Sequence, residues 1–410
     1  MNPTGGDLSS GDRIRLRDGL SKLFNLDELN QLCFELGVSY DEIPGNTLGI
    51  KAIGLIGWFS HRGRIDELLT RLADIRPNYD WPTPRPSSNS PKMIRVKVEV
   101  DNVLSFACDA LVLKYAQGFY GAGLAIVNAL ASGNSDKFTP STDNYILTSS
   151  NGKVPARQVL FVGTVDLSYF DYAEIRKFST RALSILSREM PNAKRVAMTV
   201  HGVNFGLDET ESFLALIAGI LDAVASNNVP PSLEQISIIE IDPARAKRLQ
   251  QILENNIENG LLSRKSTLEA KSLESRLSTV GLESSTKLHV FVAMPFTDEL
   301  EDTYVFGISS AVNSAGYLCE RIDSIAFTGD IMERMKARIE TASFVIGELT
   351  GANPNVYLEV GYAWGRNRPT ILLVKNADEL KFDVHGQRCI IYKNIVDLNK
   401  QLETFLNSLQ

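Results

Sequence analysis

The chain has 410 residues, of which 44% are hydrophobic and 22% charged, and its formal net charge is −7 at pH 7. Its length allows about three globular domains, and an acidic balance without clustered Lys and Arg argues against general nucleic-acid binding. The sequence has no uncharged apolar run of about 18 residues and no apolar stretch at its start, so we expect a cytoplasmic protein without a membrane span or signal peptide.

Residues 1–77 contain short apolar segments at helical spacing. Leu16, Leu20 and Leu23 recur on one helix face, and Asn25 is placed as the N-cap of a second helix. Further apolar segments complete a predicted all-α helical bundle. The motifs LFNLDELNQLCFELGVSYDEIPG and WFSHRGRIDELL resemble the effector-associated, death-like domains of bacterial conflict systems. The resemblance implies an adaptor that pairs with a protein carrying a matching effector-associated domain.

Two polar segments are predicted to be linkers. Residues 78–92 begin with NYDWPTPRPSSNSP, which is rich in Pro, Ser and Asn. Residues 259–286 are polar and show only weak helical spacing, which is compatible with a short helical spacer. Neither segment has enough apolar side chains for a core of its own.

Residues 93–258 alternate between β-rich and helical patterns. The expected strands are IRVKVEV, DALVLKY, RQVLFVGTV, RVAMTVH and QISIIEI, and helical patterns of 10 or more residues separate most of them. Strands separated by helices of this length predict a three-layer α/β domain.

Two loops of this domain are rich in glycine, and each follows a strand and precedes a helix. Glycine lets backbone N–H groups approach an anion, and a helix N-terminus favours its charge, although glycine also serves turns alone. The candidate second ligand site consists of Gly118, Gly121, Gly123, Gly202, Asn204 and Gly206. The layout resembles macro domains and the aminopeptidase N-terminal domain, which implies a nucleotide-type ligand such as ADP-ribose. Lys114-Tyr115-Ala116 stands where macro domains carry Asn-Ala-Asn.

Residues 287–410 predict a flavodoxin-like parallel sheet. An apolar run ending near Ile346 is followed by a polar turn and by a helix that starts near Asn355. In open α/β sheets this is where ligands bind. Glu359 lies in about the first turn of the helix, four residues after Asn355 and so on the same face.

The motifs VFVAMPF, CERIDSIAFTGDI, VIGELTGANPNVYLEVGYAWG and RPTILLV resemble the TIR-like, nucleoside 2-deoxyribosyltransferase-like proteins of bacterial conflict systems. The resemblance covers about 120 residues. It implies that Glu359 acts at the anomeric carbon of an N-glycoside. Members of this family often carry Asp where Glu348 stands.

A carboxylate suits N-glycosidic cleavage, because it stabilises or captures an oxocarbenium-like state at C1′. NAD is a simple substrate for a site with one carboxylate, since its cationic nicotinamide leaves without protonation. The expected substrate contacts are Met294, Pro295, Phe296, Arg321, Asp323, Glu348, Asn353 and Asn355. Other interpretations stay open: Glu359 also fits a helix-dipole role, residues 294–296 a strand-end core, and Arg321 with Asp323 a surface ion pair.

The three domains together predict a bacterial antiviral effector. The helical domain recruits a partner, the macro-like domain senses a nucleotide-type ligand, and the C-terminal domain acts as an NAD glycohydrolase. The alternatives are a nucleoside or deoxynucleotide N-glycosidase or transferase, and a non-catalytic nucleotide-binding adaptor. Because TIR-like sites are often completed across subunits, the resemblance also implies self-assembly on activation. We expect no cofactor, and the four scattered cysteines and four histidines lack metal-ligand spacing.

Overall fold

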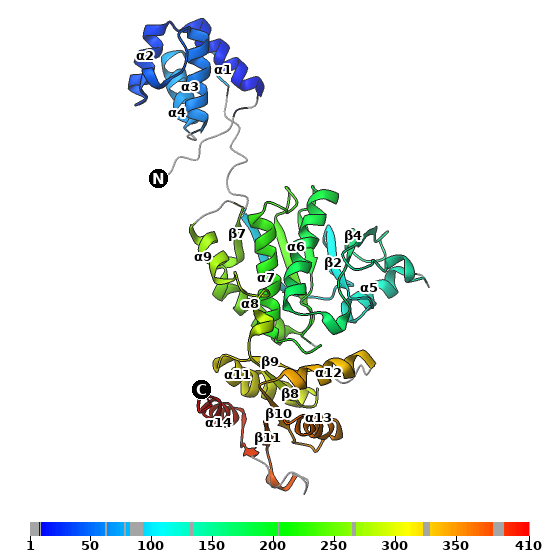
Figure 1. Ribbon diagram of the computed structural model, residues 1–410. Coiled ribbons are helices and arrows are strands. Elements are labelled where there is room, and N and C mark those ends of the chain that lie inside the picture. Colours follow the sequence, from blue (N-terminus) through cyan, green and yellow to red (C-terminus); the bar gives the residue numbers. More distant parts are fainter. Residues whose placement is uncertain are drawn as a thin grey trace. The chain divides into compact units, whose positions relative to one another are not determined.

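The computed structural model describes residues 8, 10–61, 64–77, 79–82, 93–131, 134–203, 205–264, 268–322, 329–379 and 389–409 (Figure 1). It divides into two compact units, Met1–Lys92 and Met93–Gln410. Every helix in the described part of the chain is too short or too polar to cross a lipid bilayer.

Helices form the first unit, as predicted. They are α1 (Ser10–Leu23), α2 (Leu26–Glu35), α3 (Leu48–His61) and α4 (Ile65–Ile75), with a short 3₁₀ turn at Tyr40–Glu42. Asn25 is the N-cap of α2: its side chain accepts a hydrogen bond from the Glu28 N–H, and the Glu28 carboxylate accepts one from the Asn25 N–H. This reciprocal pair satisfies two donors that a helix start leaves free.

The end of the helical unit differs from the prediction. Trp81 is only 9% exposed, its indole N–H donates to the Arg76 carbonyl at 3.1 Å, and its ring lies 4.6 Å from that of Tyr79 between centroids. The expected linker at residues 78–92 is therefore wrong at its start, because its two aromatic side chains complete the helical core. The rest of this segment, residues 83–92, lies outside the described residues.

A seven-stranded mixed sheet begins the second unit. Its strands are β1 (Met93–Val100), β2 (Ala110–Tyr115), β3 (Tyr145–Ser149), β4 (Gln158–Gly163), β5 (Arg195–Met198), β6 (Gln235–Glu240) and β7 (Leu261–Ser263). Their order is β3-β4-β2-β5-β6-β1-β7, and the neighbours are parallel except for the outer strands β3 and β7.

Helices cover both faces of this sheet. On one face α6 (Tyr172–Glu189), α7 (Glu209–Ala225) and α8 (Pro243–Asn256) share a core with the strands. On the other face α5 (Gly121–Ala131) packs over Leu111, Leu113 and Phe161. The α/β organisation expected for this part of the chain is therefore observed.

The second expected linker is part of this fold. Within residues 259–286, β7 pairs antiparallel with β1, and helix α9 (Leu268–Arg276) is followed by Leu277 and Val280, both buried in the main core. The Arg176 guanidinium donates to the carbonyls of Leu277 at 3.1 Å and Val280 at 2.6 Å. The linker prediction is wrong for the described residues, because widely spaced apolar side chains are buried against a large neighbouring core.

A five-stranded parallel sheet ends the chain, and we call it with its helices the C-terminal part. Its strands, β8 (His289–Ala293), β9 (Leu318–Glu320), β10 (Phe344–Glu348), β11 (Thr370–Val374) and β12 (Cys389–Ile391), have the order β12-β11-β10-β8-β9. Its helical segments are α10 (Asp298–Asp302), the π-helical η6 (Thr303–Ser309), α11 (Ser310–Ser314), α12 (Gly329–Thr341), α13 (Pro354–Gly365) and α14 (Ile395–Asn407).

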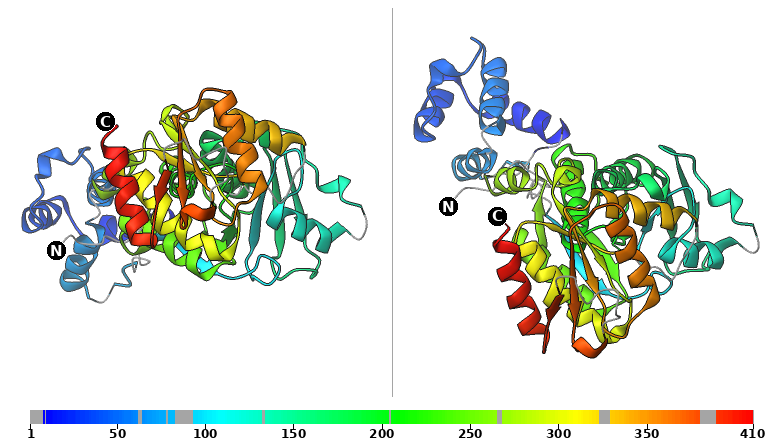
Figure 2. Two further views of the ribbon diagram at one scale, coloured as in Figure 1. Left: turned by 90° about the horizontal axis from the view of Figure 1, so that it is seen from below. Right: turned by 60° about the horizontal axis from the view of Figure 1, so that its bottom comes forward.

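These helices also lie on both faces of their sheet. η6, α11 and α14 bury one face, and Figure 2 shows red α14 beside the yellow elements. α12 and α13 bury the opposite face around Phe291 and Val345. Alternating side chains of β8 and β10 thus reach two separate cores, as expected for a sheet covered on both sides.

Candidate functional site

The order of the C-terminal strands places a topological switch point between β8 and β10. These strands are neighbours, but β8 continues to β9 on one side while β10 continues to β11 on the other. Ligands bind at the carboxyl ends of strands at such a switch point. The predicted segment 294–296 follows β8, and the loop that enters α13 follows β10.

Glu359 lies in the second turn of α13, one turn later than expected, and is 6% exposed. Its neighbours Val356 and Val360 are buried in the core that joins α13 to the sheet. A Cβ on Gly347 of β10 would come within 2.6 Å of the Val360 side chain, so glycine at this position lets the helix pack closely on the strand.

Burial raises the pKa of Glu359 to about 8. No hydrogen bond or ion pair links its carboxyl group to another residue within the described ranges. A carboxyl group in this setting is mostly protonated at neutral pH, and an approaching cation favours its ionised form. A buried titratable group with a perturbed pKa, on the helix that follows a switch-point strand, is a candidate for catalysis.

The structure brings together Arg321, Met294 and Phe296. The guanidinium carbon lies 4.2 Å from the Phe296 ring centroid and 3.6 Å from that of Tyr304, and one guanidinium nitrogen is 3.9 Å from the Met294 sulfur. Arg321 also forms an ion pair with Glu301. The Arg321 side chain is only 11% exposed, whereas that of Glu301 is 39% exposed.

Glu348 is fully buried, and its carboxylate oxygens already have partners. One oxygen accepts from the Tyr392 hydroxyl at 2.9 Å, and the other accepts from the Thr350 N–H at 2.9 Å. Burial raises the pKa of Glu348 as well. These contacts tie the end of β10 to Tyr392, which belongs to the core on the face opposite α13.

Of the remaining predicted contacts, those that the structure describes lie around the start of α13 and at the end of β8. Asn353 is the N-cap of α13 and accepts from the Asn355 N–H at 2.9 Å. The Asn355 side chain is exposed, unlike that of Glu359, and Pro295 is half-buried. Asp323 lies outside the described residues.

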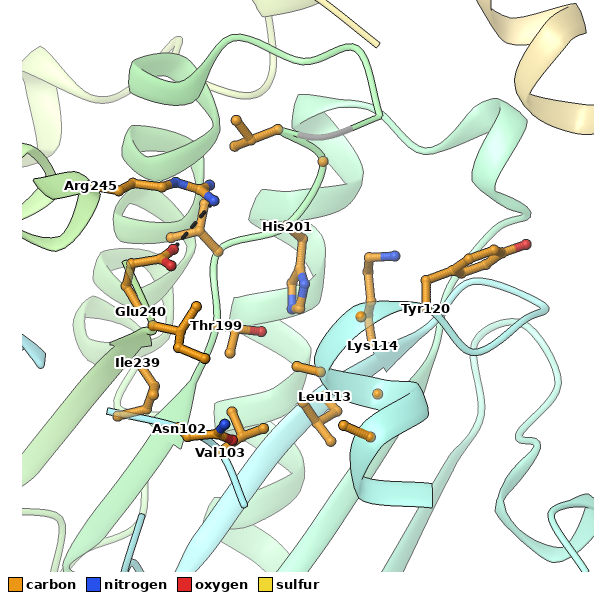
Figure 3. A pocket seen from close by; sticks show the side chains of 18 of the residues that line it. Asn102, Val103, Leu113, Lys114, Tyr120, Thr199, His201, Ile239, Glu240 and Arg245 are labelled. Atoms are coloured by element: carbon orange, nitrogen blue, oxygen red, sulfur yellow. Dashed lines mark ion pairs between the residues drawn. The ribbon is translucent and has the colours of Figure 1, made fainter. Parts of the chain in front are cut away.

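A second site is a cavity of about 370 Å³ at the carboxyl ends of the parallel strands of the seven-stranded sheet (Figure 3). It opens where β2 and β5 are adjacent but continue in opposite directions, to β4 and to β6. Of the predicted glycines, Gly121, Gly123 and Gly202 line it. Gly118 and Gly206 are not among its lining residues, and Asn204 lies outside the described residues.

Lys114, at the end of β2, lines this cavity, and its amino group lies among three aromatic rings. The nitrogen lies 4.8 Å from the ring centroid of Phe170, 5.8 Å from that of Phe205 and 5.9 Å from that of Tyr120. Burial, and to a lesser extent the charge of Arg334, lowers the pKa of Lys114 to about 8. No carboxylate within the described ranges pairs with it.

His201 follows β5 and lines the same cavity at 8% exposure. Its Nε2 is buried without a hydrogen-bond partner among the described residues. Burial, and then the charge of Lys114, lowers the pKa of His201 well below its ordinary value of 6.5. The neutral ring can donate or accept one hydrogen bond at Nε2, depending on its tautomer.

Lys114 and His201 were not among the predicted site residues, although the sequence contains a signal for each. Lys114 is the single charge in the apolar strand ALVLKY, and His201 opens the second glycine loop. The rings of Phe170 and Phe205 that surround Lys114 come from other segments, as does the Phe178 ring, whose centroid lies 4.8 Å from that of His201.

Comparison with known proteins supports the interpretation of the helical unit. Residues 16–77 match the family model of effector-associated domain 7. No curated protein matches the chain.

Several solved structures are similar to parts of the chain. They include an Oceanobacillus iheyensis macrodomain with ADP (14% identity, 40% of this chain and 92% of that chain, TM-score 0.33) and a Trypanosoma brucei macrodomain in complex with ADP-ribose (16% identity, 39% and 69%, TM-score 0.32). A Clostridium botulinum CMP N-glycosidase is also similar (18% identity, 28% and 98%, TM-score 0.25).

Proposed function

We propose that this chain is a conflict-system effector whose C-terminal part cleaves an N-glycosidic bond, with NAD as the substrate. The observation that carries the proposal is Glu359, a buried carboxyl group without a polar partner in the described part of the chain, on the helix that follows β10 at the switch point of the sheet. The match of residues 16–77 to an effector-associated domain supports the effector role and recruitment through a matching domain on a partner.

The chemistry follows from the charge of the substrate. The nicotinamide ribosyl group of NAD is cationic, so its approach favours ionised Glu359. The C1′–N bond then breaks, nicotinamide leaves with the bonding electrons as a neutral molecule, and the carboxylate stabilises the oxocarbenium-like state. Water adds to C1′, and its proton passes to Glu359 or to solvent.

Three further side chains are assigned to the leaving base. Met294 and Phe296 supply an apolar wall after β8, and Arg321 lies against the Phe296 ring with its charge compensated by Glu301. A wall of this kind excludes water and orients a planar base. Asn353 acts indirectly, because its cap stabilises the start of the helix that carries Glu359.

The raised pKa of Glu359 also favours a second candidate, a nucleoside or nucleotide N-glycosidase. A neutral base is a poor leaving group and needs a proton, which a protonated carboxyl group at neutral pH can donate. The two candidates require opposite protonation states of the same residue, so the pH dependence of the rate separates them.

The test is the release of free base by the full-length protein at high concentration, with NAD, CMP and a deoxynucleoside as substrates. Glu359→Gln is expected to lower the release of nicotinamide by about 100-fold or more. Glu333→Gln, which removes an exposed carboxylate on α12, is the matched control and is expected to keep full activity.

Two results would contradict the proposal. Equal nicotinamide release by the wild type and by Glu359→Gln would remove Glu359 from the chemistry. Binding of a nucleotide without turnover of any substrate, even after clustering through the helical unit, would favour the non-catalytic adaptor.

A further inference from the structure

An ion pair borders the side chains assigned to the leaving base, Met294 and Phe296, which we call the base subsite. Arg321 lies with its guanidinium carbon 4.2 Å from the Phe296 ring centroid, and its partner is Glu301 on the short helix α10. Arg321 is largely buried, whereas Glu301 reaches the surface. The base subsite is therefore adjacent to a positive charge that one carboxylate compensates.

The position of this positive charge is fixed by a second aromatic ring. The Arg321 guanidinium carbon also lies 3.6 Å from the ring centroid of Tyr304. Tyr304 is buried, and its hydroxyl donates to the Cys319 carbonyl at 3.3 Å. Because the core holds this ring, we expect the guanidinium to stay beside Phe296 when its carboxylate partner is removed.

The carboxylate of Glu301 is shared with the seven-stranded sheet. One Glu301 oxygen lies 4.0 Å from a guanidinium nitrogen of Arg248 on α8, and Arg248 pairs with Glu209 at 3.0 Å. Glu209 also pairs with Arg245 at 2.9 Å, and Arg245 pairs with Glu240 at 3.3 Å, which Figure 3 marks with a dashed line. With the arginine at the base subsite, this row alternates three carboxylates with three guanidinium groups. The row is neutral as a whole, so the loss of one member leaves a net charge.

A net charge beside the base subsite affects the two candidate substrate classes differently. The nicotinamide ring of NAD is a cation, whereas the bases of ordinary nucleosides are neutral. Like charges a few ångströms apart repel strongly where water is partly excluded, and an opposite charge nearby offsets the repulsion. An uncompensated Arg321 would therefore weaken the binding of a cationic ring much more than that of a neutral one.

We propose that Glu301 is a specificity-determining residue of the base subsite, because it compensates Arg321 and so admits a cationic leaving base. This role rests on the function proposed above. A neutral residue in place of Glu301 shifts the preference toward neutral bases. Removal of Arg248 shifts it toward cationic bases, because the row then carries a net negative charge. Both shifts weaken as the ionic strength rises, since salt screens charges that are near the surface.

Binding of two rings that differ in charge tests this role without turnover. The probes are nicotinamide, which is neutral, and ring-N-methylated nicotinamide, which is a cation, each titrated into the full-length protein at low ionic strength and followed by NMR. Glu301→Gln is expected to lower the affinity for the cation, relative to that for the neutral ring, by about 10-fold. Glu299→Gln removes an exposed carboxylate from the same helix and changes the net charge equally. It is the matched control and is expected to keep the wild-type ratio of affinities.

A compensating variant separates the charge of Glu301 from any structural role. Combining Glu301→Gln with Arg321→Gln makes the row neutral again, and the ratio of affinities is expected to return to its wild-type value. A loss of structure would not be restored in this way. If Glu301→Gln fails to fold, Arg248→Met is the alternative, and it is expected to raise the relative affinity for the cation by about 3-fold. Wild-type ratios in the folded variants, or a ratio that the double variant does not restore, would overturn the proposal.

Steady-state kinetics with NAD and CMP distinguish a failure of this role from a failure of the proposed function. Glu301→Gln is expected to raise the KM for NAD by about 10-fold without lowering kcat, because the ring loses its charge as the C1′–N bond breaks. Cleavage of NAD with an unchanged KM in this variant would overturn the role of Glu301 alone. Discrimination between the two rings without cleavage of either substrate would contradict only the enzymatic function. If neither ring binds the wild type, the base subsite itself is refuted.

Discussion

The hydroxyl group of Tyr172 on α6 donates a hydrogen bond of 2.7 Å to the carboxylate of Glu320 on β9, and both side chains are buried. The same hydroxyl oxygen accepts from the Asp208 N–H at 2.8 Å. Glu320 further accepts from Arg338 on α12. One phenol therefore connects helices of the seven-stranded sheet with a strand of the five-stranded sheet.

Tyr172→Phe is expected to destabilise the second unit by about 1–3 kcal/mol, because it leaves a buried carboxylate and a buried N–H with fewer partners. Urea unfolding measures the change. Tyr169→Phe, at a position that is 77% exposed, is the control and is expected to have little effect. Equal stability of the two variants would show that this hydrogen bond contributes nothing measurable.

The rate of NAD cleavage is expected to rise with pH. The pKa of Glu359 is raised to about 8 by burial, and the proposed mechanism needs the ionised carboxylate. Because kcat/KM reports the free enzyme, it should increase up to about pH 8 and then level off. A rate that instead falls above this pH would identify Glu359 as a general acid and would favour a nucleoside or nucleotide substrate.

Glu359 is also expected to make folding stability depend on pH. Its folded pKa of about 8 lies above the ordinary value of 4.5, so the folded chain holds the proton more tightly than the unfolded chain. The resulting stability is fully present below pH 4.5 and is lost as the pH rises through 8.

Glu359→Gln removes this dependence. The quantity of interest is the free energy of unfolding of the variant minus that of the wild type. It should be larger at pH 8.5 than at pH 5, by on the order of a few kcal/mol. Thermal unfolding at the two pH values checks this. Parallel stability profiles of the two proteins would mean that water reaches the carboxyl group in the folded state.

Phe296→Ala is expected to lower kcat/KM for NAD by about 10-fold, because it removes the ring that Arg321 covers and that is assigned to the leaving base. Phe306→Ala, at a position that is 54% exposed on η6, is the matched control. Base-release kinetics of both variants provide the measurement. An unchanged kcat/KM for Phe296→Ala would place the base elsewhere.

Trp81→Ala is expected to destabilise the helical unit by about 3 kcal/mol, because a large buried aromatic side chain is lost. Thermal unfolding of the full chain, followed by the circular dichroism of the helices, tests this. If Trp81→Ala leaves the midpoint temperature of the first unfolding transition unchanged, residue 81 would again be interpreted as part of a linker.

The sequence predicted the regular elements of the C-terminal part well, because they follow from local patterns. A few consecutive residues are enough to identify a buried strand such as Val345 to Gly347, or a helix start such as Asn353-Pro354. The helical unit was predicted for the same reason. Glu359 was selected by its place in a motif, but the absence of polar partners around it is a property of the packed structure.

The errors come from contacts between segments far apart in the chain. Trp81 and Leu277 stand in polar surroundings in the sequence, and each is buried by a core that other residues build. Lys114 was not predicted as a site residue for the same reason, since the rings that surround it come from residues 120, 170 and 205. Local composition carries no information about such neighbours.

The bonds of Arg334 also have a consequence for the order in which the protein is completed during synthesis. The guanidinium donates to the carbonyls of Leu167, Phe170 and Phe205, which precede it by 129 to 167 residues. A ribosome therefore releases the seven-stranded sheet well before these carbonyls acquire their donor. A chain that stops short of α12 would therefore contain the seven-stranded sheet while these three carbonyls still lacked the donor that joins them to the C-terminal part.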